Sequence, residues 1–241
     1  MAKQPADGYI IGVIGTDGMA LLPFVTKTLP FDPYKDLVAV HGLGEARYAL
    51  TANASKSFTK SYNDLIAYAK ANPGKINYGT STIQVHFPLM VLAEHHKLNW
   101  VHIPFPGGGP YLQALAAGTV DVGITGEGSA NGLGDRVRVL AITGDTRAAK
   151  FPDAPTFGEL GFPTVRGPAY AIMVRAGTPK EVVDKLGAAT GAALNTTEVQ
   201  TGFSRMLLAL TADKQDAATK KVAGQFAFYA DFTKRLGIKP E

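Results

Sequence analysis

Residues 99–126 read NWVHIPFPGGGPYLQALAAGTVDVGITG, and this stretch decides the fold. Its apolar runs predict a strand over residues 100–105 and a second strand over residues 120–125. Between them we expect a helix that begins at Pro110, since proline gives up only an amide hydrogen that a helix start leaves unpaired. The helix is expected to end near Gly118. The stretch therefore predicts a strand–helix–strand unit.

A glycine triplet joins the first strand to this helix. The amides of Gly107, Gly108 and Gly109 would lie at the positive end of the helix dipole, with no side chain to block an approaching anion. We interpret the triplet as a candidate cradle for a carboxylate or a phosphate. An ordinary tight turn is the alternative interpretation, because glycine and proline also favour turns without any ligand.

The preceding segment repeats the same plan. Residues 76–78 predict a strand, residues 79–82 a small polar loop, and the segment up to Ala93 a helix. Two successive units of this kind place two helix starts on the same carboxyl edge of a parallel sheet, the usual ligand position in open α/β sheets. We therefore expect the two loops to face a common cleft.

The rest of the chain alternates in the same way, which predicts an α/β fold with mainly parallel sheets. Apolar residues 9–14 predict a buried parallel strand, and residues 170–174 predict the last strand. Further strands are expected at 37–43, 48–52 and 137–143, and helices at 19–28, 58–71, 181–195, 198–210 and 213–236.

Two candidate crossings, near residues 48–55 and 162–170, suggest two lobes joined by a hinge. We predict an outer, discontinuous lobe made of residues 1–50 and 170–241, and a middle lobe of residues 51–169.

Composition excludes several classes of function. The 241 residues carry a net charge of +4 with scattered basic residues, which argues against a nucleic-acid partner. No stretch is long enough to cross a membrane, so no membrane insertion is expected. The absence of cysteine excludes disulfides, thiolate zinc sites and a cysteine nucleophile. The first residues lack the basic-then-apolar pattern of a secretory signal.

No motif for catalysis, metal or cofactor is found. Residues 126–130 lack a serine between the glycines of a nucleophile elbow, and the glycines near residue 15 lack the dinucleotide-binding context. His95 and His96 are adjacent, without the spacing of a helical metal pair. His86, near a helix start, could lie in the cleft, with packing as the alternative. Asp121 is expected to bond locally.

At this point the sequence resembles a known family, the solute-binding receptors of tripartite tricarboxylate transporters, also called the Bordetella-uptake type. The resemblance covers nearly the whole chain and rests on the order and spacing of several segments. These are ADGYIIGVIGT, LPFDPYKDLVAV, LIAYAKANPGKINYGTS, VHIPFPGGGPYLQALAAGTVDVGI, RVLAITGDTRAAKFPDAPTFGELGFP and RAGTP.

The resemblance implies a type II periplasmic binding protein whose two α/β lobes close over a small carboxylate and then dock on a membrane permease. It also implies a periplasmic location and binding without catalysis or cofactors. Carboxylates of the family include dicarboxylates, tricarboxylates, acidic amino acids and aromatic acids. The positions that match the family's ligand loops are Gly79, Thr80, Ser81, Gly107, Gly108, Gly109, Thr16, Asp17 and, as a further hydroxyl, Thr125.

Several departures from the family pattern matter. Thr82, Ile83 and Gln84 stand where the family loop usually carries further glycines and a serine, and Pro106 stands where a basic residue is frequent. Ala169 stands where an aromatic residue is often found. Family members also begin with about two further βα units before the segment that matches residues 6–9, so the resemblance implies an N-terminally truncated outer lobe.

Two alternatives to transport remain open at this stage. The chain could be a ligand receptor for a sensor kinase, because sensing and transport use the same closure. It could also be a degenerate, truncated family member with weak or no binding. Asp17 could select an amino group, as in an acidic amino acid, because an unpaired acidic residue would repel a carboxylate.

Overall fold

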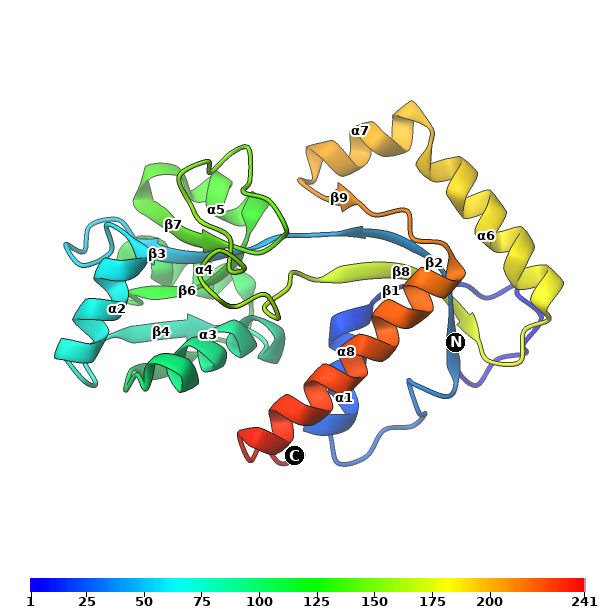
Figure 1. Ribbon diagram of the computed structural model, residues 1–241, viewed down its shortest axis with the longest axis horizontal. Helices are drawn as coiled ribbons and strands as arrows, with labels where there is room; N and C mark the ends of the chain where they lie inside the picture. Colours follow the sequence, from blue (N-terminus) through cyan, green and yellow to red (C-terminus); the bar gives the residue numbers. More distant parts are fainter. Residues whose placement is uncertain (241) are drawn as a thin grey trace. The chain divides into compact units, whose positions relative to one another are not determined.

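A computed structural model describes residues 1–240 and divides the chain into two compact units (Figure 1). Unit 1 consists of Met1–Ala46 together with Pro168–Glu241, and unit 2 consists of Arg47–Gly167. Each unit has its own sheet. Among the residues described, none of the helices combines the length and the apolar character needed to span a bilayer.

Unit 1 contains a four-stranded sheet in the order β1-β8-β2-β9, in which every described pairing is antiparallel. Its strands are β1 (Gly12–Gly15), β2 (Leu37–Glu45), β8 (Ala169–Arg175) and β9 (Ala209–Leu210). Its helices are α1 (Thr16–Val25), α6 (Lys180–Leu194), α7 (Thr197–Arg205) and α8 (Gln215–Arg235).

The first strand differs from its prediction. The structure has a strand only over Gly12–Gly15, antiparallel to β8 at the end of the sheet order. Tyr9 is 91% exposed and Val13 is 64% exposed. The prediction of a buried parallel strand was therefore wrong, because an apolar run shows extended structure but not how many neighbours cover it.

The C-terminal part also contains a short strand that was not predicted. The expected helix over residues 198–210 ends at Arg205 in α7, and Ala209–Leu210 form β9, which pairs with Gly44 and Glu45 of β2. A single turn of chain with Leu207 at φ 55° redirects the backbone between the two elements. The strand over residues 170–174 is confirmed as β8, although it is not the last strand.

Unit 2 contains a five-stranded sheet in the order β5-β4-β6-β3-β7. Its strands are β3 (Tyr48–Asn53), β4 (Asn77–Thr80), β5 (Val101–Pro104), β6 (Val122–Gly126) and β7 (Val137–Ile142). Its helices are α2 (Tyr62–Ala71), α3 (Ile83–His96), α4 (Gly108–Ala117), α5 (Glu127–Leu133) and the 3₁₀ turn η1 (Gly134–Arg136).

Strand direction in unit 2 is mixed, and the prediction of mainly parallel sheets was wrong. β4 is parallel to both β5 and β6, whereas β3 is antiparallel to both β6 and β7. The parallel strands are joined by helical crossovers, as parallel pairing requires. β3 follows β2 directly and needs no crossover of this kind, so its direction is free to oppose that of β6.

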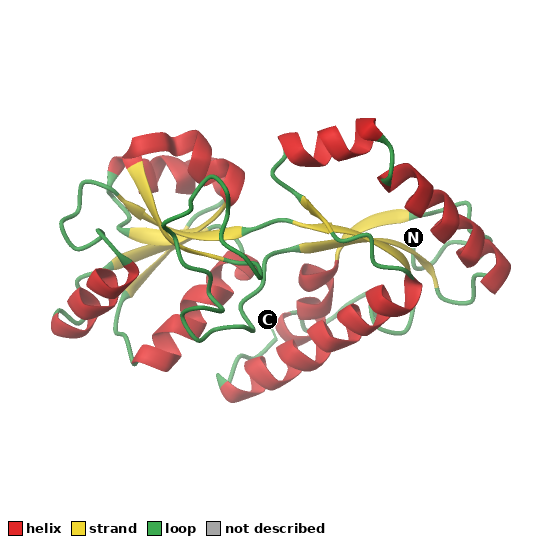
Figure 2. Ribbon diagram, turned by 45° about the horizontal axis from the view of Figure 1, so that its top comes forward, coloured by secondary structure: helices red, strands yellow, loops and turns green. Residues whose placement is uncertain are grey.

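Helices cover both faces of the unit 2 sheet (Figure 2). One face forms the larger core, in which Leu65 of α2 and Leu89 and Leu92 of α3 are fully buried. The other face forms a smaller core around Tyr111 and Leu115 of α4. The predicted apolar face of α2 is confirmed, and Ser61 begins this helix by accepting a hydrogen bond from the Asp64 amide.

The position of α4 depends on two glycines beneath one aromatic ring. A Cβ on Gly79 would lie 2.9 Å from the Tyr111 ring, and a Cβ on Gly123 would lie 2.1 Å from the Tyr111 hydroxyl oxygen. That hydroxyl donates to the Ile124 carbonyl at 3.0 Å. The paired glycines of β4 and β6 therefore form a notch, which we call the glycine notch, that admits the tyrosine and fixes α4 on the sheet.

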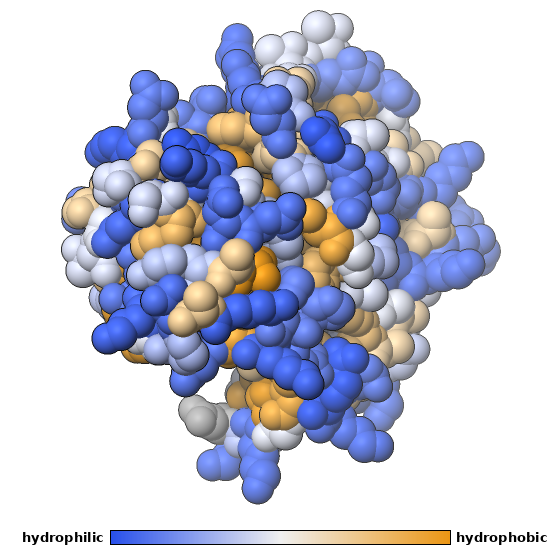
Figure 3. All heavy atoms as spheres, turned by 60° about the vertical axis from the view of Figure 1, so that its left-hand side comes forward, coloured by the Kyte–Doolittle hydropathy of each residue, from blue (hydrophilic) through white to orange (hydrophobic). Residues whose placement is uncertain are grey.

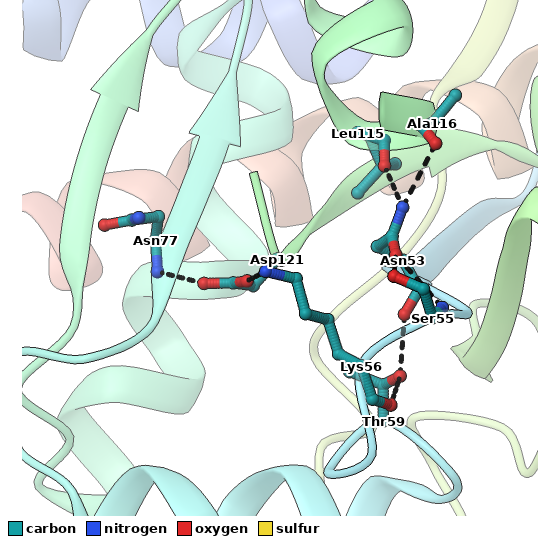
Figure 4. Close-up of polar contacts among 8 residues, drawn as sticks. All are labelled: Asn53, Ser55, Lys56, Thr59, Asn77, Leu115, Ala116 and Asp121. Carbon is teal, nitrogen blue, oxygen red and sulfur yellow. Dashed lines mark hydrogen bonds and ion pairs between the residues drawn. The ribbon is translucent and has the colours of Figure 1, made fainter. Parts of the chain in front are cut away.

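The amino ends of β4 and β6 are closed by the chain's own side chains (Figure 4). The buried Asp121 carboxylate accepts from the Asn77 amide at 2.8 Å and pairs with the Lys56 ammonium at 3.0 Å. Asn53 donates to the carbonyls of Leu115 and Ala116 at the end of α4. The prediction that Asp121 bonds locally was wrong, because both of its partners lie far from it in the sequence. The polar groups at this edge bind one another and leave little polar capacity for a ligand.

Adding a methyl group in the glycine notch should displace Tyr111 and weaken the packing of α4 on the sheet. We expect Gly123→Ala to lower the free energy of unfolding by about 2 to 3 kcal/mol, because the Tyr111 ring must leave its place. Chemical unfolding followed by circular dichroism measures this change. The matched control is Gly132→Ala in α5, where a Cβ meets nothing within 4 Å. Equal stability of the two variants would show that the notch does not fix the helix.

Candidate functional site

Three helices of unit 2 begin at one edge of its sheet. α3, α4 and α5 follow the parallel strands β4, β5 and β6 in turn, and parallel strands present their carboxyl ends on the same side. The prediction that two strand–loop–helix units share one carboxyl edge is therefore confirmed. We call this the carboxyl edge of unit 2.

Only some of the helix starts are open to an anion. α1 and α5 each carry an acidic residue in the first turn, Asp17 and Glu127 respectively. α3 and α4 carry none, and no side chain caps the amides at either start. In α1 and α5 a carboxylate of the chain already lies at the partial positive charge of the helix start. In α3 and α4 none does, so the starts of α3 and α4 are the candidate anion-binding sites.

The glycine triplet forms the start of α4, because this helix begins two residues earlier than predicted. The helix begins at Gly108 with Gly107 as its N-cap, so Pro110 occupies the third position and not the first. The first internal bond runs from the Tyr111 amide to the Gly107 carbonyl, which leaves the amides of Gly108 and Gly109 without a carbonyl of the helix to bind. A Cβ on any of the three glycines would meet nothing within 4 Å. The chain's own packing therefore does not require glycine here.

The other predicted loop divides into a buried and an accessible part. Gly79 lies in the glycine notch under Tyr111, and Thr80 is 4% exposed with its hydroxyl 2.6 Å from Nε2 of His102. Ser81 is half-buried and is followed by the exposed N-cap of α3, Thr82. The structure thus brings Ser81 to the carboxyl edge, while Gly79 and Thr80 support it from below.

Thr125 is the penultimate residue of β6, near the same edge, but its hydroxyl already has a hydrogen-bond partner. The side chain is buried, and its oxygen lies 2.8 Å from the Thr51 hydroxyl oxygen. The Thr51 hydroxyl donates to the Ala49 carbonyl at 3.1 Å, so the Thr125 proton is the one shared between the two threonines. This arrangement leaves Thr125 without a free hydrogen for a ligand.

The two predicted residues of unit 1 lie in a helix and not in a loop. The expected loop at Thr16 and Asp17 is the first turn of α1, which follows β1 without any intervening residue. The Thr16 hydroxyl donates to the Ala169 carbonyl at 3.3 Å and is buried. Gly15, the N-cap, still has the extended backbone of the strand, so the chain passes directly from strand to helix.

Asp17 carries a buried carboxyl group whose pKa is raised. Burial raises its pKa to about 6, and the backbone amides of Asp17, Gly18 and Ala169 partly oppose this shift. Its charge in turn contributes to a raised pKa of Tyr170 and Tyr229. The Asp17 carboxyl group therefore changes its charge near neutral pH. This makes it a candidate for distinguishing between ligands of different charge.

Sequence reasoning missed two charged residues near the carboxyl edge of unit 2. Glu127 is 7% exposed at the start of α5, and burial raises its pKa while the Arg47 charge opposes this. Arg47 is held by the Thr146 carbonyl at 2.9 Å, and the Glu127 amide donates to the Arg47 carbonyl. An acidic residue directly after a strand-ending glycine is the one local signal that marks Glu127.

One hollow of unit 2 lies elsewhere. It measures about 680 Å³ and is lined by residues such as Lys60, Arg138, Leu140 and Phe151, with none of the predicted site residues. The face of the molecule drawn in Figure 3 carries mostly hydrophilic residues, with hydrophobic ones in separate small areas. The helix starts are therefore a better guide to the site than the size of a hollow, because they supply a specific ligand chemistry.

Comparison with known proteins shows the family and the fold of this chain. The chain is 33% identical over 189 residues to the UPF0065 protein in the gbd 5' region of Cupriavidus necator, covering 77% of this chain and 57% of that protein's length. It resembles the structure of Rpa4515 from R. palustris with adipate, with a TM-score of 0.82 and 27% identity over 100% of this chain and 82% of the other.

MatC from Rhodopseudomonas palustris with bound malate is similar at a TM-score of 0.75 and 26% identity, over 95% of this chain and 81% of the other. The type II binding-protein architecture predicted from the sequence is confirmed by these likenesses. The model of the tripartite tricarboxylate transporter family receptor matches residues 1–226. The family is one of receptors and not of enzymes, and the chain belongs to it.

Proposed function

We propose that this protein is an extracytoplasmic, periplasmic receptor that captures a small carboxylate and delivers it to the permease of a tripartite tricarboxylate transporter. The observation that carries the proposal is the pair of adjacent helix starts, α3 and α4, which carry no acid in their first turns. Structural relatives that hold adipate and malate support a small carboxylate as the ligand.

The contacts we propose follow from which groups are free. The amides of Gly108 and Gly109 and the loop at Ser81 would bind the carboxylate, as would the backbone at Gly107. Gly79, Thr80 and Thr125 are proposed to hold these loops in place from beneath, because their own groups are buried or bonded.

Thr16 and Asp17 are proposed to contribute to ligand recognition from unit 1. An ionised Asp17 would repel a carboxylate and attract an ammonium group. We therefore infer that Asp17 favours ligands with an amino group, such as glutamate or aspartate, over simple diacids when it is ionised. Its pKa of about 6 means that this preference is strongest above that pH.

The proposal is tested by a thermal-shift screen against adipate, malate, citrate, succinate, glutamate and aspartate. A ligand at 100 times its dissociation constant should stabilise the protein by about 2.7 kcal/mol, which is easily measured as a rise in Tm. A cooperative melt that none of these acids shifts would contradict carboxylate binding. Delivery to the permease is tested by uptake of the binding acid in cells that carry both proteins.

A methyl group on the glycine triplet should report directly on ligand approach. Because a Cβ on Gly108 meets nothing within 4 Å, Gly108→Ala should keep the Tm of the unliganded protein. If the carboxylate contacts this backbone, the variant should bind it at least about tenfold more weakly, a loss of about 1.4 kcal/mol. Isothermal titration calorimetry measures the change, and Gly132→Ala is again the control. Unchanged affinity would place the ligand away from α4.

Asp17 should make stability depend on pH. Its native pKa of about 6 lies above the ordinary value of 3.8, so the carboxyl group favours folding while protonated and destabilises the protein as pH rises from about 4 to about 6. The cost approaches about 3 kcal/mol at neutral pH. Urea unfolding should show Asp17→Asn gaining stability over the parent between about pH 4 and pH 7. Asp231→Asn, at an exposed position of α8, should show no such gain; equal behaviour of both variants would refute the assignment.

A further inference from the structure

Two histidines are in contact near the start of α3. His86 is in the first turns of this helix, His102 is on β5, and their rings stack with centroids 4.1 Å apart. The Tyr78 ring stacks on His102 at 4.9 Å and its hydroxyl lies 2.9 Å from Nε2 of His86. Neither histidine belongs to a group that could hold a metal ion among the residues described.

One of these rings contacts a loop of the proposed ligand site. Nε2 of His102 lies 2.6 Å from the Thr80 hydroxyl, and Thr80 is the residue before Ser81. If the ring donates from Nε2, the Thr80 hydroxyl keeps its single hydrogen for another acceptor, and Nδ1 of His102 remains free to take up a proton. His102 therefore links the carboxyl edge of unit 2 to a titratable group.

The charges around the pair favour uptake of a single proton. Burial lowers the pKa of both rings, and for His86 the charge of His102 lowers it further, to about 4. Tyr78 of β4 is the other titratable group of the cluster, and burial raises its pKa. Apart from this effect of His102 on His86, no carboxylate or cation of the described residues contributes to the pKa shift of either imidazole. His102 is the more exposed of the two rings, and burial is the cause of its lowered pKa.

We propose that His102 is a positioning residue for the ligand site, and that it takes up one proton when the carboxylate is captured. This inference rests on the proposed function, because it needs an anion at this edge. A negative ligand favours the positive form of a nearby imidazole, and by linkage the protonated ring binds the ligand more tightly. Pro106 stands before the glycine triplet, where a basic residue is frequent in the family, so this position supplies no charge. His102 would supply a positive charge instead, and only when the ligand is bound.

The sign of the effect separates this role from simple packing. Between about pH 8 and about pH 6, adipate and malate remain largely dianionic, so a change in affinity reports on the protein. We expect the Kd of the acid that binds to fall about five- to tenfold over this range, which is well within the limit of about a hundredfold that uptake of one proton sets over two pH units. Calorimetry in two buffers of different ionisation enthalpy should show net proton uptake on binding at about pH 7.

The variant His102→Gln keeps a side-chain donor but cannot titrate in this range. Asp17 also titrates in this range, so the comparison is made in an Asp17→Asn background. There we expect His102→Gln to bind more weakly than Asp17→Asn alone and to show nearly the same Kd at both pH values. The control is His95→Gln, at an exposed histidine in the last turn of α3, which should keep the full dependence on pH. In the parent protein, nuclear magnetic resonance should show the pKa of His102 rising when adipate or malate is added.

The outcomes distinguish the two proposals. Binding with the same Kd at both pH values, or a dependence on pH that survives His102→Gln in the Asp17→Asn background, would overturn the role of His102 and leave the receptor function intact. Failure of adipate, malate and the other four acids to bind at either pH would overturn the proposed function and this inference with it. If the variant does not fold, proton uptake and the His102 titration of the parent protein decide the question.

Discussion

The contact between Tyr111 and the glycine notch is the constraint on which the rest of unit 2 depends. The ring can lie flat on the sheet only because Gly79 and Gly123 are neighbours on β4 and β6 and neither has a Cβ. Its hydroxyl bonds to Ile124 and fixes the rotation of α4 about its own axis. Because the helix is rigid, fixing its middle also fixes the direction in which the amides of its first turn point.

The polar groups at the two edges of the parallel strands differ in whether side chains of the protein bind them. At the amino edge Asp121, Lys56 and Asn53 saturate the polar groups of the chain with one another. At the carboxyl edge the starts of α3 and α4 have no such partners from side chains. A polar group that the fold leaves without a partner at a helix start is the physical basis for assigning the anion there.

Local signals made part of this structure predictable. The strands of residues 99–126, the apolar face of α2 and the shared carboxyl edge follow from periodicity, glycine and proline, and the structure confirms them. Pro110 misplaced the helix start by two residues because glycine can also occupy helical positions, and sequence alone does not reveal which residue the first turn includes. These errors shift boundaries and leave the arrangement of the elements intact.

Other features depend on contacts that a local pattern does not contain. Whether Tyr9–Val13 is covered, and whether β3 runs with or against β6, is decided by distant segments. The same holds for the burial of Asp17 and for the contact of His102 with Thr80 across two strands. The family resemblance located the ligand loops, but only the structure shows that Thr125 has no hydrogen to offer and that Gly79 is a packing residue.

The glycine notch has a consequence for how ligand preference can change over time. Glycine is sterically required at positions 79 and 123, whereas at 107, 108 and 109 a new side chain would project into open space. Substitutions in the second set can alter what fits at the helix start without disturbing the fold. Scaffold and selectivity are thus carried by separate residues, which allows descendants of one such receptor to diverge in the acids they accept while keeping the same architecture.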